Sequence, residues 1–306
     1  MSGSPSYRGR IAPSPTGYLH LGHAMTFRAA MERGCSREGG TLILRIEDLD
    51  ASRCKPEFRD AIPEDLHWFG IQWQEGPDIG GPCAPYEQSR RDYVPAWRQL
   101  RDAGLIYPCT CSRKDVLSAL TAPHEQREPR EPREPHGQRE PHGQREPHDD
   151  EPLYPGACRH RLAEAREIES PAGVNWRFRV PDGEEIIFHD GRMAERRAIA
   201  GRDFGDFLVW RKDNIPSYQL AVVADDIAMR ITEVVRGEDL LQSTFRQLLL
   251  YRALGCAAPA WYHCPLVRDT EGRRLAKRHA ALSLRELRAS GATPENIPQR
   301  HGAAEP

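Results

Sequence analysis

The chain has 306 residues, 39% of them hydrophobic and 29% charged, with a formal net charge of −2 at pH 7. These values predict a soluble globular protein of one large or two smaller domains, and they argue against a strongly basic nucleic-acid binder. No run of about 18 apolar residues occurs and the opening MSGSPSYRGR has no apolar segment, so we expect neither a membrane span nor a secretory signal, and a cytoplasmic location.

The first predicted elements are a strand at 8–12, a helix from about residue 20 to 33 and a strand at 41–47. A strand, a helix and a strand in this order form a βαβ unit with a parallel sheet, so the sequence predicts an α/β fold. The segment DYVPAWRQLRDAG, 92–104, has the pattern of a further helix, which Gly104 is placed to end.

The stretch RIAPSPTGYLHLGH, from Arg10 to His23, joins the first strand to the first helix. Gly17 permits a tight turn, and Gly22 in the first helical turn lets a ligand approach the backbone. Ligands of parallel α/β sheets bind at such helix N-termini, where His20 and His23 share a face and can donate hydrogen bonds to a triphosphate. A surface turn with two incidental histidines is the open alternative.

Residues 121–152 are a repetitive segment built from REP and EPHGQR units. Nine acidic residues against five arginines give it a net charge of −4, which leaves +2 for the rest of the chain. With almost nothing apolar to bury, we expect a disordered insertion. A metal-binding tract that uses His136, His142 and His148 is the alternative.

Beyond this segment the alternation of patterns continues with expected strands at 175–180 and 185–190. Three apolar segments follow, at 206–210, 218–226 and 231–237. The stretch LQSTFRQLLLYRALG, 241–255, predicts a helix with an apolar face that Gly255 closes.

Two smaller features carry candidate chemistry. The loop GRRLAKRH brings together Arg273, Arg274, Lys277 and Arg278. Cations on a loop can stabilise the negative charge of a departing pyrophosphate. A solvated basic loop without a role in catalysis is the alternative. The eight cysteines are scattered except for three, which in a reducing compartment favour a metal site over disulfides. These are Cys109, Cys111 and Cys158.

The motifs HLGH, at 20–23, and RLAKR, at 274–278, resemble the HIGH and KMSKS signatures of class I aminoacyl-tRNA synthetases. More narrowly, RIAPSPTGYLHLGH, RIEDLD, PSYQLAVVADD, ITEVVRGEDL and RLAKR resemble the glutamyl branch, in the same order, over roughly residues 8–280 apart from the insertion. Glutamyl-tRNA synthetases continue into a helical anticodon-binding region. Because only about thirty residues follow RLAKR, the chain resembles the short paralogous family, the glutamyl-queuosine tRNA(Asp) synthetases.

This resemblance implies a Rossmann-type parallel-sheet catalytic domain with an inserted zinc-bearing subdomain and no C-terminal anticodon-binding domain. We expect the first half of the catalytic domain at 1–104, the inserted subdomain at 105–200, and the second half, with the KMSKS-like loop, at 201–306.

The resemblance also implies the residues of the site. It places L-glutamate on Arg10, Ile11, Ala12, Pro13, Ser14, Glu47, Tyr218 and Arg236. It places ATP on His20, Gly22, His23 and Lys277, with His20, His23 and Lys277 as catalytic residues. Two arginines would serve the two carboxylates of glutamate, and Glu47 its ammonium group. An internal ion-pair network of Arg10, Glu47 and Arg236, with Tyr218 in the core, is the alternative.

For the cysteines, the family pattern implies one structural Zn²⁺ held by Cys109, Cys111, Tyr154 and Cys158. Water or His160 could take the place of Tyr154.

The implied reaction is the activation of L-glutamate with ATP, with Mg²⁺ accompanying ATP, and transfer of the glutamyl group to the queuosine base at the wobble position of tRNA(Asp). The alternatives are a truncated synthetase that charges tRNA(Glu), and a zinc-containing tRNA-binding protein without catalysis. We expect a monomer. The sequence departs from the family pattern at His23, at Arg274 and Ala276, and at Asn214, where asparagine replaces a usual glycine and is suited to a positive φ.

Overall fold

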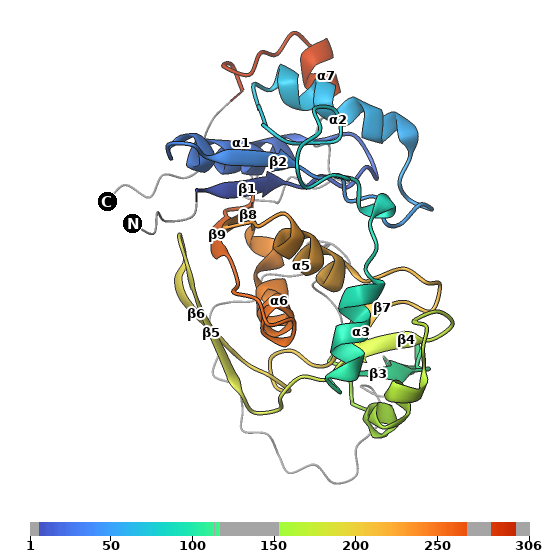
Figure 1. Cartoon of the computed structure of the whole chain (residues 1–306). Coiled ribbons are helices and arrows are strands. Elements are labelled where there is room, and N and C mark those ends of the chain that lie inside the picture. Colours follow the sequence, from blue (N-terminus) through green and yellow to red (C-terminus); the bar gives the residue numbers. More distant parts are fainter. Residues whose placement is uncertain (1–5, 113, 117–152, 268–282, 298–306) are drawn as a thin grey trace.

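The computed structural model describes residues 6–112, 114–116, 153–267 and 283–297 (Figure 1). The repetitive segment 121–152 and the KMSKS-like motif with Lys277 lie outside the described residues. Within the described part, no helix is both long and apolar enough to cross a membrane.

The N-terminal unit consists of strand β1 (Arg8–Ile11), helix α1 (Leu21–Cys35) and strand β2 (Thr41–Leu44). The two strands pair in parallel along their whole length, which confirms the predicted βαβ unit. Both strands end earlier than predicted, at Ile11 rather than 12 and at Leu44 rather than 47. For β1 the reason is local, because Pro13 has no N–H to continue a ladder.

A four-stranded sheet continues the fold in the order β6 (Ala194–Ile199), β5 (Glu185–Asp190), β9 (Ala260–Cys264) and β8 (Glu233–Gly237). Strands β8 and β9 are parallel, as are β5 and β9, whereas β5 and β6 form an antiparallel hairpin. Just before β8, the Thr232 N–H donates to Arg8 O at 2.9 Å, so β8 lies beside β1 (Figure 1).

A separate antiparallel sheet has the order β3 (Ile106–Cys109), β4 (Asn175–Phe178) and β7 (Phe207–Trp210). Two pairs of strands join segments on either side of the predicted boundary at residue 200, because β7 pairs with β4 and β9 pairs with β5. The division of the chain at 104 and 200 stays a prediction.

Further helices in the described part of the chain are α2 (Pro56–Trp68), α3 (Val94–Asp102), α5 (Tyr218–Ala228), α6 (Leu241–Ala253) and α7 (Leu284–Ala289), with short 3-10 helices at Gln88–Arg90, Arg159–Leu162, Glu164–Glu167 and Glu238–Leu240. The predicted helices at 92–104 and 241–255 are confirmed as α3 and α6. The apolar segment 218–226 forms α5, which Ser217 caps by accepting a hydrogen bond from the Leu220 N–H. Asn214, in the turn before α5, has φ +63°, as expected for a residue that replaces glycine.

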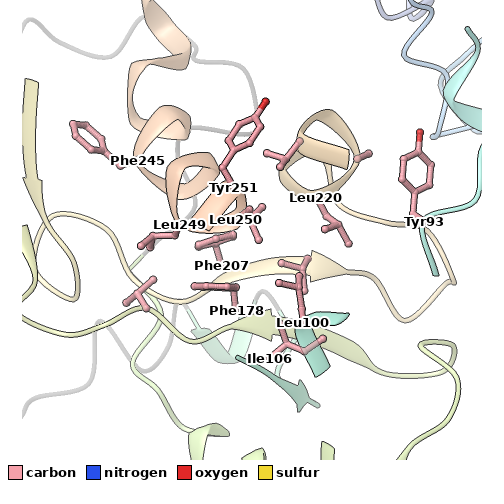
Figure 2. Close-up of a cluster of buried hydrophobic side chains, with 14 of the residues drawn as sticks. Tyr93, Leu100, Ile106, Phe178, Phe207, Leu220, Phe245, Leu249, Leu250 and Tyr251 are labelled. Atoms are coloured by element: carbon pink, nitrogen blue, oxygen red, sulfur yellow. The ribbon is translucent and has the colours of Figure 1, made fainter. Parts of the chain in front are cut away.

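A large hydrophobic core fixes α5 and α6 to the three-stranded sheet (Figure 2). In it, Phe178 of β4 and Phe207 of β7 stack with ring centroids 5.3 Å apart, and Leu220 of α5 and Leu250 of α6 are completely buried. A second core, which includes Ile11 and Leu44, lies under the N-terminal unit. Because α5 and α6 are packed in this way, the polar side chains that they carry are held in fixed positions.

Candidate functional site

A cavity of about 200 Å³ lies where β1 and β8 end and where α1 and α5 begin. The carboxyl ends of adjacent strands and the N-termini of helices are where parallel α/β sheets bind ligands. The lining residues that the sequence predicts for glutamate or ATP are Arg10, Ala12, Pro13, Ser14, His20, Gly22, His23, Glu47, Tyr218 and Arg236. Of the other two, Ile11 is fully buried in the core beneath, and Lys277 is outside the described residues.

The HLGH motif forms the start of α1. His20 is extended, with φ −113° and ψ 169°, and its carbonyl accepts the His23 N–H at 3.0 Å. The two imidazole rings stack with centroids 3.7 Å apart. A Cβ on Gly22 would lie 3.1 Å from the His20 ring, so glycine leaves room for that ring as well as for a ligand. Both histidines line the cavity at a helix N-terminus, where anions are favoured.

Arg10 and Glu47 take part in a buried ion-pair network. Arg10 Nη1 donates to Val235 O at 3.1 Å, and its Nε lies 3.5 Å from Asp226 Oδ1. Arg45, which has no exposed surface, donates to Asp226 at 2.5 Å and to Glu47 at 3.0 Å. Burial raises the pKa of Glu47, and the charges of Arg45 and Arg10 oppose that shift. Arg10 and Glu47 therefore both line the cavity and belong to an internal network.

The acidic pair at the end of the PSYQLAVVADD motif anchors this network. Asp225 accepts hydrogen bonds from Gln88 at 2.7 Å and Tyr93 at 3.1 Å, and it forms an ion pair with Arg91 at 2.7 Å. Burial raises the pKa of Asp225, against the charge of Arg45. Neither this acidic pair nor Arg45 was predicted as part of the site. The position of Arg45 within the apolar run TLILRIE could have indicated a buried charge that needs an acidic partner.

Arg236, the last residue but one of β8, is held on several sides by polar groups. Nη1 donates to Gln247 Oε1 at 2.9 Å, and Nη2 donates to Thr244 Oγ1 at 2.7 Å and to Leu240 O at 3.2 Å. Nε lies 3.3 Å from His263 Nε2. The guanidinium therefore has a fixed orientation at the wall of the cavity that it lines.

The contacts of His263 settle its tautomer. Arg236 Nε–H can only donate, so His263 Nε2 is the acceptor and Nδ1 carries the proton. Nδ1 donates to Asp190 Oδ2 at 2.6 Å. Burial lowers the pKa of His263, although the bond to Asp190 opposes the shift. Burial also acts to raise the pKa of Asp190, but hydrogen bonds from His263 and from the Met193 and Arg192 backbone bring it to about 2.

Tyr218 is the first residue of α5 and is half-buried in the wall of the cavity. Burial raises the pKa of its phenol to about 12, so the hydroxyl is protonated at neutral pH. The following residue, Gln219, accepts a hydrogen bond from Gln247 at 3.0 Å and donates to Ser243 at 2.9 Å. Tyr218 is therefore not a core residue but part of the rim above the Arg236 network.

The three predicted cysteines meet at the end of β3. Their Sγ atoms all lie within 4.8 Å of one another, and in the described part of the chain they form a group that could hold a metal ion. The Tyr154 hydroxyl lies 3.4 Å from Cys109 Sγ and 3.3 Å from Cys111 Sγ, and Cys111 Sγ lies 3.6 Å from Cys158 Sγ. His160 is exposed and outside this group.

The donors of this cluster fit zinc. Three thiols are ligands that closed structural zinc sites use, and the phenol oxygen of Tyr154 would be an unusual fourth ligand. Burial raises the pKa of the Cys158 thiol, but hydrogen bonds from Tyr154 and the Thr110 backbone outweigh burial and lower it to about 6.

The fold and the cavity define an α/β catalytic domain of the class I synthetase type, with the HLGH turn at the start of its first helix. The chain belongs to the family described as tRNA synthetases class I (E and Q), catalytic domain, which it matches over residues 6–299. The α/β fold class and the enzyme class implied by the sequence are thereby confirmed.

Individual relatives show which branch of this family the chain resembles most. The chain is 44% identical to the Glutamyl-Q tRNA(Asp) synthetase of Nitratidesulfovibrio vulgaris, over 95% of this chain and 83% of that protein. It is 43% identical to the Glutamyl-Q tRNA(Asp) synthetase of Symbiobacterium thermophilum, over 94% and 83%. It is 39% identical to the Glutamate--tRNA ligase 1 of Halorhodospira halophila, over 94% of this chain and 56% of that protein. The resemblance to the short paralogous family is confirmed.

A solved structure also matches. The glutamate tRNA ligase of Elizabethkingia meningosepticum, in complex with its amino acid, superposes with a TM-score of 0.66 at 27% identity. The match covers 94% of this chain and 53% of that chain.

Proposed function

We propose that this protein activates L-glutamate with ATP, releasing pyrophosphate, and transfers the glutamyl group to the queuosine base at the wobble position of tRNA(Asp). The cavity carries the proposal, because it joins two buried arginines, a carboxylate and a pair of histidines at the carboxyl edge of the parallel strands. The names of the relatives at 43–44% identity support this acceptor.

Glutamate is a dicarboxylate with one ammonium group, and the cavity offers matching charges. Arg10 and Arg236 bind the two carboxylates through charge-assisted hydrogen bonds. Glu47 receives the ammonium group. The pairing of Glu47 with Arg45 keeps its carboxylate oriented, although burial acts to raise its pKa. Ala12, Pro13 and Ser14 border the amino acid.

ATP binds across the start of α1, with its phosphates facing His20 and His23 over Gly22 and with Lys277 as a further cation. An oxygen of the glutamate carboxylate attacks the α-phosphorus, the bond to the bridging oxygen breaks, and pyrophosphate leaves with that electron pair. Positioning and charge stabilisation provide the catalysis, so no nucleophilic side chain is needed. Mg²⁺, when bound with ATP, neutralises part of the phosphate charge.

The cysteine cluster is proposed to bind one Zn²⁺ through Cys109, Cys111, Tyr154 and Cys158. Four protein ligands close the coordination shell, so this ion serves structure and not the reaction. We further propose a cytoplasmic monomer whose RNA partner is tRNA(Asp) carrying queuosine.

His263 is expected to matter for glutamate binding although it is fully buried behind Arg236. Replacement with glutamine retains an acceptor for Arg236 Nε but loses the bond to Asp190, whereas leucine removes both. We expect His263→Leu to raise the KM for glutamate about tenfold, which corresponds to about 1.4 kcal/mol, with little change in the KM for ATP. Pyrophosphate-exchange kinetics measure both constants.

Partial recovery of the glutamate KM in His263→Gln would support this positioning role. Equal increases in the KM values for glutamate and ATP, or a fall in kcat alone, would indicate general damage to the fold instead.

The first experiment measures exchange of pyrophosphate into ATP, without RNA, with glutamate, aspartate or glutamine as the only amino acid. The proposed function predicts exchange that only glutamate supports efficiently, because aspartate is too short to reach both arginines and glutamine lacks the second charge. A protein with no exchange at all would be the tRNA-binding protein without catalysis.

A further inference from the structure

The HLGH turn at the start of α1 is attached to helix α7, which lies near the other end of the described chain. His20 pairs with Ser283 in an isolated antiparallel bridge, and the Leu284 N–H donates to Leu19 O at 2.7 Å. The side chains of Leu19 and Leu284 are buried in the same hydrophobic core. Helix α7 therefore supports the backbone directly before His20.

Ser283 gives α7 a fixed start. Its hydroxyl accepts the Glu286 N–H at 3.2 Å, and the Glu286 carboxylate accepts the Ser283 N–H at 2.7 Å. These two reciprocal bonds form a capping box, which satisfies N–H groups that the start of a helix otherwise leaves unpaired. The bridge to His20 is therefore made by a residue with a fixed conformation and not by a frayed helix end.

Arg285, in the first turn of α7, joins this helix to α2 (Figure 1). Its Nε lies 3.1 Å from Asp65 Oδ1, and its Nη2 donates to Glu64 Oε2 at 2.6 Å. Asp65 is only 2% exposed, so its carboxylate needs the counter-charge that Arg285 provides. Burial raises the pKa of Asp65, and the charge of Arg285 opposes that shift. The same guanidinium lies over the Tyr18 ring, 5.4 Å from its centroid, so it also contacts the residue that begins the turn.

Helix α2 also contacts this turn directly. At its N-terminus, the Lys55 N–H donates to Pro15 O at 3.1 Å. The rings of Tyr18 and Phe58 meet edge to face, with centroids 4.9 Å apart and 81° between their planes. Residues 15–20 therefore contact both α2 and α7, and the ion pair described above joins these two helices.

The ion pair lies outside the cavity proposed for glutamate and ATP. Neither Arg285 nor Asp65 lines that cavity, whereas Leu19 and His20 do. An effect of the ion pair on the reaction must therefore pass through the backbone of the turn. Because the rings of His20 and His23 stack at 3.7 Å, a shift of that backbone moves both rings. A misplacement of about 1 Å in a reacting geometry can lower a rate about 10²-fold.

We propose that Arg285 and Asp65 are positioning residues for ATP, because their ion pair fixes the HLGH turn so that its two histidines face the triphosphate. This inference rests on the proposed function. The arginines proposed for glutamate, Arg10 and Arg236, have separate supports in α5, α6 and β8. Loss of the ion pair therefore weakens ATP binding and slows adenylate formation without changing the affinity for glutamate.

The test uses Asp65→Asn, which keeps the shape of the side chain but removes its charge, together with Arg285→Gln and the double variant, all in the full chain. The matched control is Arg288→Gln, which removes an arginine of the same helix that pairs with Glu64 at 3.0 Å. Pyrophosphate exchange gives kcat and the KM values for ATP and glutamate. Calorimetry gives the Kd for ATP without glutamate, and thermal unfolding gives the stability of each variant.

Asp65→Asn and Arg285→Gln are each expected to raise the Kd and the KM for ATP about five- to tenfold and to lower kcat about tenfold. The KM for glutamate should stay within about twofold of the value for the unchanged protein. The double variant should show the same losses as the single variants, because both substitutions remove one interaction. The control should match the unchanged protein in every constant.

Unchanged ATP constants in both single variants would overturn the inference even if their temperatures of unfolding fall, because the ion pair would then serve stability alone. Equal increases in the KM values for ATP and glutamate, or the same losses in Arg288→Gln, would also overturn it. An unchanged protein that binds ATP but does not exchange pyrophosphate would refute the proposed function, and the Kd for ATP of the variants would still decide the inference.

Discussion

Arg236→Lys is expected to raise the KM for glutamate about 30- to 100-fold and to leave the KM for ATP within about twofold. Lysine keeps the charge but loses the planar group whose N–H groups can hold neighbouring side chains and a carboxylate at the same time. A charge-assisted hydrogen bond contributes about 1.5–3 kcal/mol, and about 1.4 kcal/mol corresponds to a tenfold change. Lysine also cannot reproduce the bonds to Thr244, Gln247 and Leu240 that orient the group.

A matched control is Arg8→Lys. Arg8 also forms two hydrogen bonds to a carboxylate, Glu75, at 2.8 and 3.0 Å, but it does not line the cavity. The Arg8→Lys substitution should lower the temperature of unfolding without changing the KM for glutamate. If Arg8→Lys and Arg236→Lys changed that KM to the same extent, Arg236 would have no specific role in glutamate binding.

Cys158→Ser is expected to abolish stoichiometric zinc and to destabilise the protein by about 4 kcal/mol. A metal ion whose free concentration is a thousand times its Kd stabilises the folded protein by about 4 kcal/mol, and this stabilisation is lost with the ion. The loss is large because Cys109, Cys158 and Tyr154 are buried together and the ion would join them. Metal analysis of the purified protein and denaturant unfolding measure the two effects.

Cys35→Ser serves as the control, since Cys35 is exposed at the end of α1 and outside the cluster. It should retain zinc and full stability. Purified protein without zinc, together with a Cys158→Ser variant of unchanged stability, would show that the cluster is not a metal site.

The N-terminal part of the site could be predicted because its signals are local. The βαβ order, the start of α1 after His20 and the left-handed conformation of Asn214 each depend on residues near in sequence. The predicted cysteines also meet, although Cys158 follows Cys111 by 47 positions, and here the family pattern and not a local signal implied the group.

The supports of the site depend on distant contacts and were not predicted. Arg45 meets Asp226 across 181 positions, and His263 meets Asp190 across 73. Nothing near Arg45 or His263 in the sequence indicates these partners, since Arg45 directly follows the apolar strand β2 and His263 lies in the largely aromatic strand β9. Helix α2 was also missed, because its interior proline and its many charges weaken the helical pattern.

The central claim is the identity of the acceptor. It is tested most directly by incubating the protein with labelled glutamate, ATP and one purified RNA at a time: tRNA(Asp) with queuosine, tRNA(Asp) without it, and tRNA(Glu). We expect stable labelling of the queuosine-containing tRNA(Asp) alone. Equal labelling of tRNA(Asp) without queuosine, or labelling of tRNA(Glu) in its place, would contradict the account.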